Sequence, residues 1–237
     1  MPLELPTPIT YLITSGETTR ATTPESAEFA RLLALVRAAT IARVSLIQLR
    51  EKNLDARTLY ELTARAARLT RPTRTTRLLV NDRADIARAA GADGVHLTTR
   101  SLHASVVRRA FGTHFLIGVS THTQAEAQEA RTAGADFAVF GPVFDTPSKR
   151  PYGAPVGLDA LRAAARTLSP FPLLALGGVT RENARAVFRA GASGVAAIRL
   201  FADADQLAET VGALENSARE ILCESSAGAD TADEGTR

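Results

Sequence analysis

The sequence predicts a single (β/α)8 barrel. Short apolar runs alternate with segments of helical periodicity, eight of each, and no long linker or change in composition divides the chain. Most runs are almost continuously apolar, which is typical of parallel strands covered on both faces. The length of 237 residues suits one such barrel. An open doubly wound sheet is the alternative. It usually has fewer strands and a Gly-rich loop after the first, where this chain has only Ser15-Gly16-Glu17-Thr18.

The strands are placed at the β-branched and aliphatic runs, and the helices at the periodic segments between them. The expected strands are 11–14, 45–50, 77–81, 94–97, 115–120, 137–140, 173–176 and 194–200. The first helix starts with Thr23 as N-cap and Pro24 at its first position, and it runs to residue 38. The other expected helices are 55–70, 84–90, 101–110, 123–133, 158–168, 181–190 and 203–221.

Three of the helices end at the same signal. Gly91, Gly134 and Gly191 each lie in an Ala-Gly-Ala triplet, where glycine can adopt the left-handed conformation that closes a helix. We therefore expect one barrel domain over residues 1–222. The remaining residues, 223–237, are rich in Ser, Ala, Gly, Asp and Glu, which predicts a disordered tail.

Composition and charge exclude several classes of protein. The formal net charge is +3 with scattered basic residues, so the sequence indicates no nucleic-acid partner despite a pI near 9.5. The single cysteine cannot form an intramolecular disulfide. No apolar stretch approaches the roughly 20 residues that cross a bilayer, and the first residues lack the pattern of a signal peptide. We expect a cytoplasmic protein without membrane contact, and a homo-oligomer is compatible with the sequence.

A row of side chains that bind anions follows the second predicted strand. Gln48 and Arg50 share one face by the period of a strand, and Lys52 continues that face into the loop. Only two residues in the chain are lysines, Lys52 and Lys149. The strip suits a polyanion such as pyrophosphate, because arginine offers a bidentate fork and lysine a point charge. The alternative is a polar layer inside the barrel with a solvated lysine.

The ends of the seventh and eighth strands indicate a phosphate site. Gly177-Gly178 would let backbone N–H groups approach a phosphate, at the loops where barrels commonly bind one. Arg199 at the end of the eighth predicted strand strengthens this interpretation. A tight structural turn explains the two glycines equally well.

The segment after the sixth predicted strand forms a loop of roughly 16 residues, which is too long for a simple connection. It contains Thr146, Ser148 and Lys149 as a cluster of hydroxyl groups and a cation, and four prolines limit its disorder. We interpret it as a lid over the mouth of the barrel. A rigid surface loop is the alternative.

Two further strand ends carry side chains for metal binding or proton transfer. Asp82, next to Asn81, could hold Mg²⁺, which uses one or two carboxylates together with substrate phosphates. It could equally cap the following helix. His122 follows the fifth strand, where an imidazole could transfer protons, or it could be structural.

These residues resemble the thiamine phosphate synthase and thiazole tautomerase superfamily over about residues 11–201. The motifs that carry the resemblance are Gln-Leu-Arg-Glu-Lys, Val-Asn-Asp-Arg, Gly-Val-His-Leu, Ile-Gly-Val-Ser-Thr-His-Thr, Gly-Ala-Asp-Phe, Gly-Pro-Val-Phe-Asp-Thr-Pro-Ser-Lys and Leu-Gly-Gly-Val. The resemblance implies an enzyme that uses Mg²⁺ to join a hydroxymethylpyrimidine pyrophosphate to a thiazole phosphate, with release of pyrophosphate.

The resemblance also assigns roles by position. It implies a strip for pyrophosphate and pyrimidine, including one Mg²⁺ carboxylate, made of Gln48, Arg50, Lys52, Asn81, Asp82 and Ser120. It implies lid contacts and a cradle for the thiazole phosphate, made of Thr146, Ser148, Lys149, Gly178 and the backbone of Ile198 and Arg199. Cations and Mg²⁺ would stabilise the charge that develops on the departing pyrophosphate.

One position departs from the synthase pattern. After Gly-Val-His-Leu, the synthases carry an aspartate that is the second Mg²⁺ carboxylate, and this chain has Ser101 there. Tautomerase-like relatives also lack that aspartate and use a histidine that would correspond to His122, which makes a thiazole tautomerase the second hypothesis. A phosphate-binding barrel without catalysis is the third. The intact Gln48, Arg50 and Lys52 favour the synthase.

Overall fold

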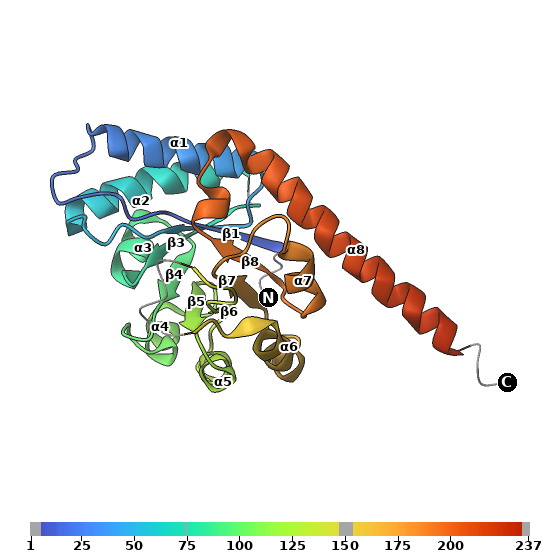
Figure 1. The fold of residues 1–237 in the computed structure, drawn as a ribbon. Coiled ribbons are helices and arrows are strands. Elements are labelled where there is room, and N and C mark those ends of the chain that lie inside the picture. Colours follow the sequence, from blue (N-terminus) through green and yellow to red (C-terminus); the bar gives the residue numbers. More distant parts are fainter. Residues whose placement is uncertain (1–5, 74, 147–153, 234–237) are drawn as a thin grey trace.

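The computed structural model describes residues 6–73, 75–146 and 154–233, the last nine of these by their backbone alone. Its eight strands form one closed parallel barrel in chain order (Figure 1). The barrel closes because β1 pairs with both β2 and β8. The predicted (β/α)8 barrel is confirmed.

The strands lie at the apolar runs of the sequence. They are β1 (Ile9–Ile13), β2 (Leu46–Leu49), β3 (Arg77–Asn81), β4 (Gly94–Leu97), β5 (Leu116–Thr121), β6 (Phe137–Phe140), β7 (Leu173–Leu176) and β8 (Gly194–Ala197). The prediction for the last strand was wrong at its end, since β8 stops at Ala197 and a 3-10 helix, η2 (Arg199–Phe201), follows. Ile198 leaves the strand conformation with φ −93° and ψ −66°.

The helices surround the barrel. They are α1 (Ala27–Ile41), α2 (Ala56–Thr70), α3 (Ala84–Ala90), α4 (Ala104–Phe111), α5 (Gln124–Thr132), α6 (Gly157–Leu168), α7 (Ala184–Arg189) and α8 (Leu207–Asp233), with a second 3-10 helix, η3 (Ala204–Gln206), before the last. The cap of α1 is Ser26 rather than Thr23, because Thr23 and Ser26 close a turn before the helix begins. The glycines of all three Ala-Gly-Ala triplets have a left-handed φ of 79–91°, as predicted.

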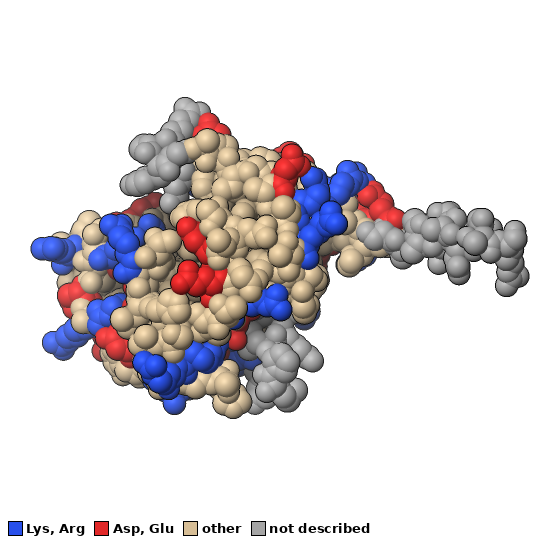
Figure 2. All heavy atoms as spheres, turned by 90° about the horizontal axis from the view of Figure 1, so that it is seen from below, with Lys and Arg blue, Asp and Glu red and all other residues tan. Residues whose placement is uncertain are grey.

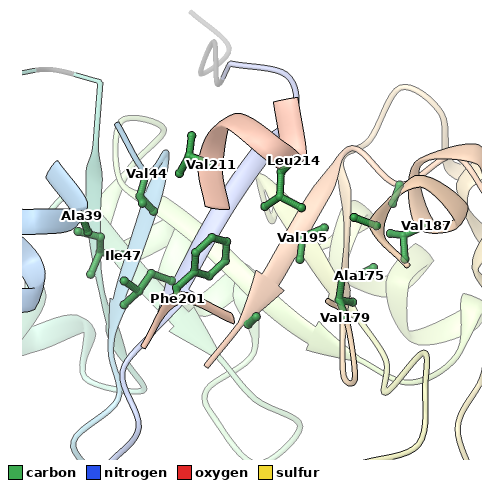
Figure 3. Packing of buried hydrophobic residues seen from close by; sticks show 14 of the residues in the cluster. Ala39, Val44, Ile47, Ala175, Val179, Val187, Val195, Phe201, Val211 and Leu214 are labelled. Carbon is green, nitrogen blue, oxygen red and sulfur yellow. The ribbon is translucent and has the colours of Figure 1, made fainter. Parts of the chain in front are cut away.

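The apolar core has an inner and an outer layer. Inside the barrel, the large side chains of Tyr11, Leu46, Leu79 and Phe137 meet. Outside it, strand residues such as Ile47 pack against the helices, and Figure 3 shows part of this layer around Phe201 and α8. Because every strand is covered on both faces, its carboxyl end is the main place where polar side chains can gather.

The C-terminal helix α8 extends away from the barrel at its far end (Figure 1). Its first turns pack on the barrel through Leu207 and Leu214. Further along, Glu224 forms ion pairs with Arg185 and Arg189 of α7. The composition of residues 223–237 predicts a disordered tail. In the structure, residues 223–233 form the last part of α8, whose first turns are well packed. The domain boundary at residue 222 stays a prediction.

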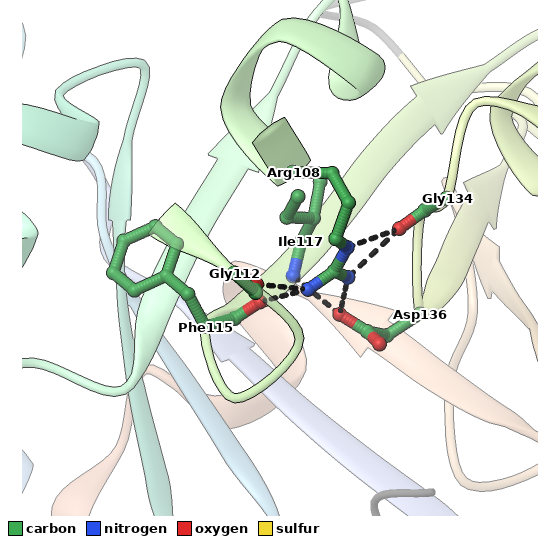
Figure 4. A network of polar contacts seen from close by, with 6 residues as sticks. All are labelled: Arg108, Gly112, Phe115, Ile117, Gly134 and Asp136. Atoms are coloured by element: carbon green, nitrogen blue, oxygen red, sulfur yellow. Dashed lines mark hydrogen bonds and ion pairs between the residues drawn. The ribbon is translucent and has the colours of Figure 1, made fainter. Parts of the chain in front are cut away.

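A clamp at the amino ends of the strands ties α4, β5 and β6 together (Figure 4). Arg108 donates hydrogen bonds of 2.7–2.9 Å to three backbone carbonyl oxygens, those of Gly112, Phe115 and Gly134. It also donates to Asp136 Oδ2 at 2.7 Å, and the same oxygen accepts the N–H of Ile117 at 2.7 Å. Burial raises the pKa of Asp136, while Ile117 and Arg108 act in the opposite direction.

Acidic and basic side chains are interspersed on the face of the molecule that Figure 2 presents. In the part of the chain that the structure describes, no helix combines the length and the apolar character needed to cross a membrane.

Candidate active site

A chain of hydrogen bonds links polar side chains at the carboxyl ends of β2 and β3. Gln48 Nε2 donates to Asn81 Oδ1 at 3.3 Å, and Asn81 Nδ2 donates to Asp82 Oδ2 at 2.9 Å. Gln48 and Asn81 are buried, whereas Asp82 is exposed. The alternation of side chains along parallel strands places Gln48 and Asn81 on the inner face of the barrel. Three residues named from the sequence are therefore brought into one hydrogen-bonded group.

A histidine to which the sequence assigned no role lies on the neighbouring strand, at the same end of the barrel, which we call the mouth. His96 of β4 is buried, and its Nε2 lies 2.8 Å from Ser120 Oγ of β5, the hydroxyl predicted to contact pyrophosphate. Its ring lies 5.7 Å from the ring of Tyr11 in the barrel interior. Burial lowers the pKa of His96 to about 4, with the charge of Asp82 acting in the opposite direction. His96 is therefore neutral at pH 7 and positions Ser120 without adding charge.

The buried His96 predicts a loss of stability in acid. Between pH 6.5 and about 4, the unfolded chain binds a proton at this side chain and the folded protein does not, so the free energy of unfolding falls as the pH falls. A pKa lowered from 6.5 to about 4 corresponds to about 3 kcal/mol. Urea unfolding at pH 7 and pH 4.5 should show a smaller loss for His96→Gln than for the wild type. The exposed His114→Gln is the matched control. Equal losses in all three proteins would contradict the assignment.

The aspartate at the end of β3 is held by two side chains. Asp82 has a left-handed φ of 59°, which is uncommon for a residue other than glycine. Its Oδ2 accepts from Asn81, and its Oδ1 accepts a hydrogen bond from the hydroxyl of Ser101. Thr98 N–H donates to Ser101 Oγ at 2.6 Å, which fixes that hydroxyl in turn. Ser101 thus contacts the one carboxylate that the sequence assigns to Mg²⁺.

The residues of the predicted cationic strip differ in exposure. Gln48 is buried, Arg50 is half-buried and Lys52 is exposed, so the strip runs from the barrel interior to the surface. The N–H of Arg50 donates to Thr14 Oγ1 at 2.8 Å. The guanidinium lies close to Gly16, where an added Cβ would be 3.4 Å from Arg50 Nη1. Arg50 is thereby placed beside the loop that joins β1 to α1.

The ends of β7 and β8 form the other side of the mouth. Gly178 has a left-handed φ of 67°, and an added Cβ would lie 2.7 Å from Phe144 Cβ, so glycine is required there. Asn183 Nδ2 donates to Gly178 O at 2.9 Å and fixes the turn. Arg199 is the first residue of η2 and is exposed, with Ile198 just before it. The sequence placed Arg199 on the strand itself, and the early end of β8 explains the difference.

The described part of the loop after β6 contains one buried hydroxyl. Thr146 is 6% exposed, and its Oγ1 has no hydrogen-bond partner among the described residues. Burying an unpaired hydroxyl is unfavourable, so this group is suited to a ligand. The N–H groups of Val143 and Phe144 donate to carbonyl oxygens at the end of β7, which anchors the start of the loop. Ser148 and Lys149 lie outside the described residues.

His122 is exposed and has a defined ring orientation. Its Nδ1 lies 2.5 Å from the carbonyl oxygen of Gly141, and its backbone N–H donates to Glu126 Oε2 at 2.6 Å. Because a carbonyl oxygen only accepts, Nδ1 carries the proton in the neutral ring and Nε2 has the lone pair. Nε2 is therefore the His122 nitrogen that remains available to a hydrogen-bond donor.

Asp82, at the end of β3, is the carboxylate that the sequence assigns to Mg²⁺. Nowhere in the described ranges do three or more His, Cys, Asp or Glu side chains gather as a metal site. Asp82, held by Asn81 and Ser101, fits a Mg²⁺ ion only if phosphate oxygens of a substrate and water supply the other ligands.

A cavity of about 360 Å³ lies beside the mouth, between α1, the loop after β1, and η2. Its walls include Leu32 and Leu35 of α1, Ser15 and Thr18 of the loop, and Phe201 of η2. Ile13, Glu51 and Ile198 also line it, so the cavity reaches from the loop next to Arg50 to the carboxyl ends of β1, β2 and β8.

Fold and site together define a (β/α)8-barrel enzyme whose polar and basic groups gather at the carboxyl ends of the strands. The chain belongs to the thiamine monophosphate synthase family, whose sequence model matches residues 19–201. It is 50% identical to a putative thiamine-phosphate synthase of Geobacter sulfurreducens over 73% of this chain and 81% of that protein. It is 40% identical to a thiamine-phosphate synthase of Haloarcula marismortui over 87% of this chain and 95% of that protein.

A solved structure agrees with these relatives. The thiamine phosphate pyrophosphorylase of Pyrococcus furiosus superimposes with a TM-score of 0.73 at 28% identity, over 91% of this chain and 98% of that one. The resemblance deduced from the sequence motifs is thus confirmed at the level of the family.

Proposed function

We propose that the protein is a thiamine-phosphate synthase that joins a hydroxymethylpyrimidine pyrophosphate to a thiazole phosphate. The observation that carries this proposal is the hydrogen-bonded group of Gln48, Asn81 and Asp82 at the carboxyl ends of β2 and β3, with Arg50 two residues beyond Gln48. An amide pair, a carboxylate and a guanidinium match a substrate with a polar heterocycle and a pyrophosphate. We propose that the protein acts in the cytoplasm and that it binds these two small phosphorylated molecules.

The reaction requires stabilisation of a departing anion. The C–O bond between the pyrimidine methylene carbon and the pyrophosphate breaks, and the electron pair leaves with the pyrophosphate. The thiazole nitrogen then supplies the electron pair of the new C–N bond. Arg50, Lys52 and Lys149 stabilise the leaving group, because fixed positive charges act strongly where negative charge develops. Arg50, whose guanidinium lies beside Gly16, is in place before the reaction begins, which avoids much of the cost of reorganising solvent.

The remaining contacts bind the two substrates. Ser120, held by His96, and the hydroxyls of Thr146 and Ser148 donate to the pyrophosphate. The phosphate of the thiazole lies at the ends of β7 and β8, where Gly178 and the backbone of Ile198 and Arg199 approach it. The two substrates thus use different groups of residues at the mouth.

Asp82 is the residue that would hold Mg²⁺, together with oxygens of the pyrophosphate. When bound, the ion neutralises charge on the leaving group. Ser101 stands where a second carboxylate could bind Mg²⁺, and it donates a hydrogen bond to Asp82 instead. The protein therefore supplies one carboxylate ligand at this position. The free protein should therefore bind Mg²⁺ weakly.

Ser101→Asp should tighten the binding of Mg²⁺ to the free protein about tenfold or more, because it adds a second carboxylate beside Asp82. Titration calorimetry with MgCl2 in the absence of substrate measures this change. Ser101→Asn, of the same size and without charge, is the control. Equal Mg²⁺ affinities for the Asp and Asn variants would argue against metal binding at Asp82.

Turnover with both substrates tests the proposed function directly. Purified protein with the pyrimidine pyrophosphate, the thiazole phosphate and Mg²⁺ should form thiamine phosphate and pyrophosphate in equal amounts. Absence of both products over a range of Mg²⁺ concentrations would refute the proposal.

His122 and Ser101 favour a second candidate, a thiazole tautomerase. The hydrogen bond to Gly141 leaves Nε2 of His122 with a lone pair that can accept a proton. Such an enzyme would shift a proton on a carboxylated thiazole phosphate. Incubation with that compound alone separates the candidates, because isomerisation without coupling would support the tautomerase.

A further inference from the structure

Glu51 is a buried carboxylate between two residues assigned to substrate binding, and the mechanism above gives it no part. It is 2% exposed, although it lies between Arg50 and Lys52 in the sequence. Burial of a carboxylate is costly unless hydrogen bonds compensate for the lost water. The structure supplies four of them, all from the loop that joins β1 to α1.

The four hydrogen bonds fasten this loop at three points. Glu51 Oε1 accepts from Thr14 Oγ1 at 2.5 Å and from Gly16 N at 3.3 Å. Its Oε2 accepts from Thr18 Oγ1 at 2.6 Å and from Thr18 N at 3.3 Å. Asn53 adds a fifth bond from the same segment, donating to Thr18 O at 2.9 Å. One carboxylate therefore sets the path of five consecutive residues.

Two of these points also contact Arg50. The hydroxyl of Thr14 donates to Glu51 and accepts the N–H of Arg50 at 2.8 Å, so it joins the two residues. Gly16 lies against the guanidinium and against Arg50 O, which is 3.1 Å from the position of an added Cβ. A displacement of the loop would thus reach Arg50 both at its backbone and at its side chain.

Packing gives this loop limited support from its other side. Ser15 and Glu17 are exposed and line the cavity of about 360 Å³ beside the mouth, whereas Thr18 is buried and bonded to Glu51, which lines the same cavity. Hydrogen bonds to Glu51 therefore carry much of the task of holding the loop.

We propose that Glu51 is a positioning residue that, through Thr14 and the loop after β1, holds Arg50 in the place where it binds pyrophosphate. This inference rests on the proposed function, because it takes Arg50 as a pyrophosphate ligand. Glu51 itself does not touch the substrate. Its carboxylate acts by holding Arg50, and the charge of Arg50 contacts the pyrophosphate.

Thr14 offers a matched pair of variants for the test. Thr14→Val keeps the shape of the side chain and removes the hydroxyl that joins Glu51 to Arg50, whereas Thr14→Ser keeps that hydroxyl. Glu51→Gln keeps the length of the side chain but leaves one pair of loop donors facing an amide group. Circular dichroism and thermal unfolding of each full-length variant establish that it is folded.

Titration calorimetry with inorganic pyrophosphate and Mg²⁺ is the main measurement. The Kd for pyrophosphate should rise about tenfold in Thr14→Val and in Glu51→Gln and stay within about twofold in Thr14→Ser. The Kd for the thiazole phosphate, which is bound at β7 and β8, should change less than twofold in all three. A general loss of structure would weaken both ligands, so this selectivity identifies positioning.

Three results would overturn the inference: equal pyrophosphate affinities in Thr14→Val and Thr14→Ser, equal weakening of both ligands, or no binding of pyrophosphate by the wild type. Should Glu51→Gln fail to fold, the Thr14 pair decides the question alone. Failure of the proposed function has a different signature. In that case the wild type binds pyrophosphate, and the variants still differ, but no thiamine phosphate forms from the two substrates.

Discussion

Arg50→Ala should lower kcat/KM for the pyrophosphate substrate about 10²- to 10³-fold. The guanidinium is half-buried at the mouth, beside Gly16 and beyond the buried Gln48, so its charge is less screened than that of a surface residue. Removal of one preorganised donor from a site of developing negative charge typically costs an effect of this size. Steady-state kinetics with the thiazole phosphate held at saturation measure it, and the KM of the thiazole phosphate should stay nearly constant.

Two variants control this experiment. Arg50→Lys retains the charge and loses the bidentate geometry, so its kcat/KM should lie between those of the wild type and Arg50→Ala. Arg57→Ala removes an exposed arginine at the start of α2 and should have no effect. Equal losses for both substrates in Arg50→Ala, or no loss, would show that this side chain does not bind the pyrophosphate.

Arg108→Met should lower the free energy of unfolding by about 3 kcal/mol. The substitution keeps much of the aliphatic stem, but it leaves the carboxylate of Asp136 and three backbone carbonyl oxygens without their charged donor (Figure 4). Both side chains are about three-quarters buried or more, with 19% and 27% exposure, so water replaces the lost bonds incompletely. Urea denaturation followed by circular dichroism gives the change.

The neighbouring Arg109→Met is the matched control, because Arg109 is exposed on the same helix. It should change the free energy of unfolding by less than about 0.5 kcal/mol. The double variant Arg108→Met with Asp136→Asn should be less destabilised than the sum of the single variants, since both remove the same interaction. Strict additivity would mean that the ion pair contributes nothing of its own.

The sequence was sufficient to predict the barrel because its strands are buried on both faces and form unbroken apolar runs. The same signal caused the error at the end of β8. The run from Gly194 to Leu200 remains largely apolar where the backbone turns into η2, so hydrophobicity alone could not show the change. Likewise, Thr23 and Ser26 are both good N-cap residues, and the turn that selects Ser26 depends on their mutual contacts.

The parts of the candidate site that the sequence missed are the residues that act through others. His96 lies in an apolar strand and reads as a core residue, and its contact with Ser120 depends on the pairing of β4 with β5. Glu51 lies between two basic residues and reads as a solvated charge, although the loop after β1 encloses it. Gln48, Asn81 and Asp82 could be named because their polarity at strand ends is visible in the sequence itself.

The Arg108 clamp joins residues at the ends where helices lead into β5 and β6, whereas the mouth is built at the opposite ends of the strands. Closure of the fold and recognition of substrates are thus encoded in separate sets of loops. Substitution of Ser101, or replacement of a whole loop at the mouth by that of a relative, should alter metal and ligand preference. The contacts of the Arg108 clamp should stay unchanged. The loops at the carboxyl ends of the strands can therefore change without loss of the contacts at the amino ends that hold the barrel together.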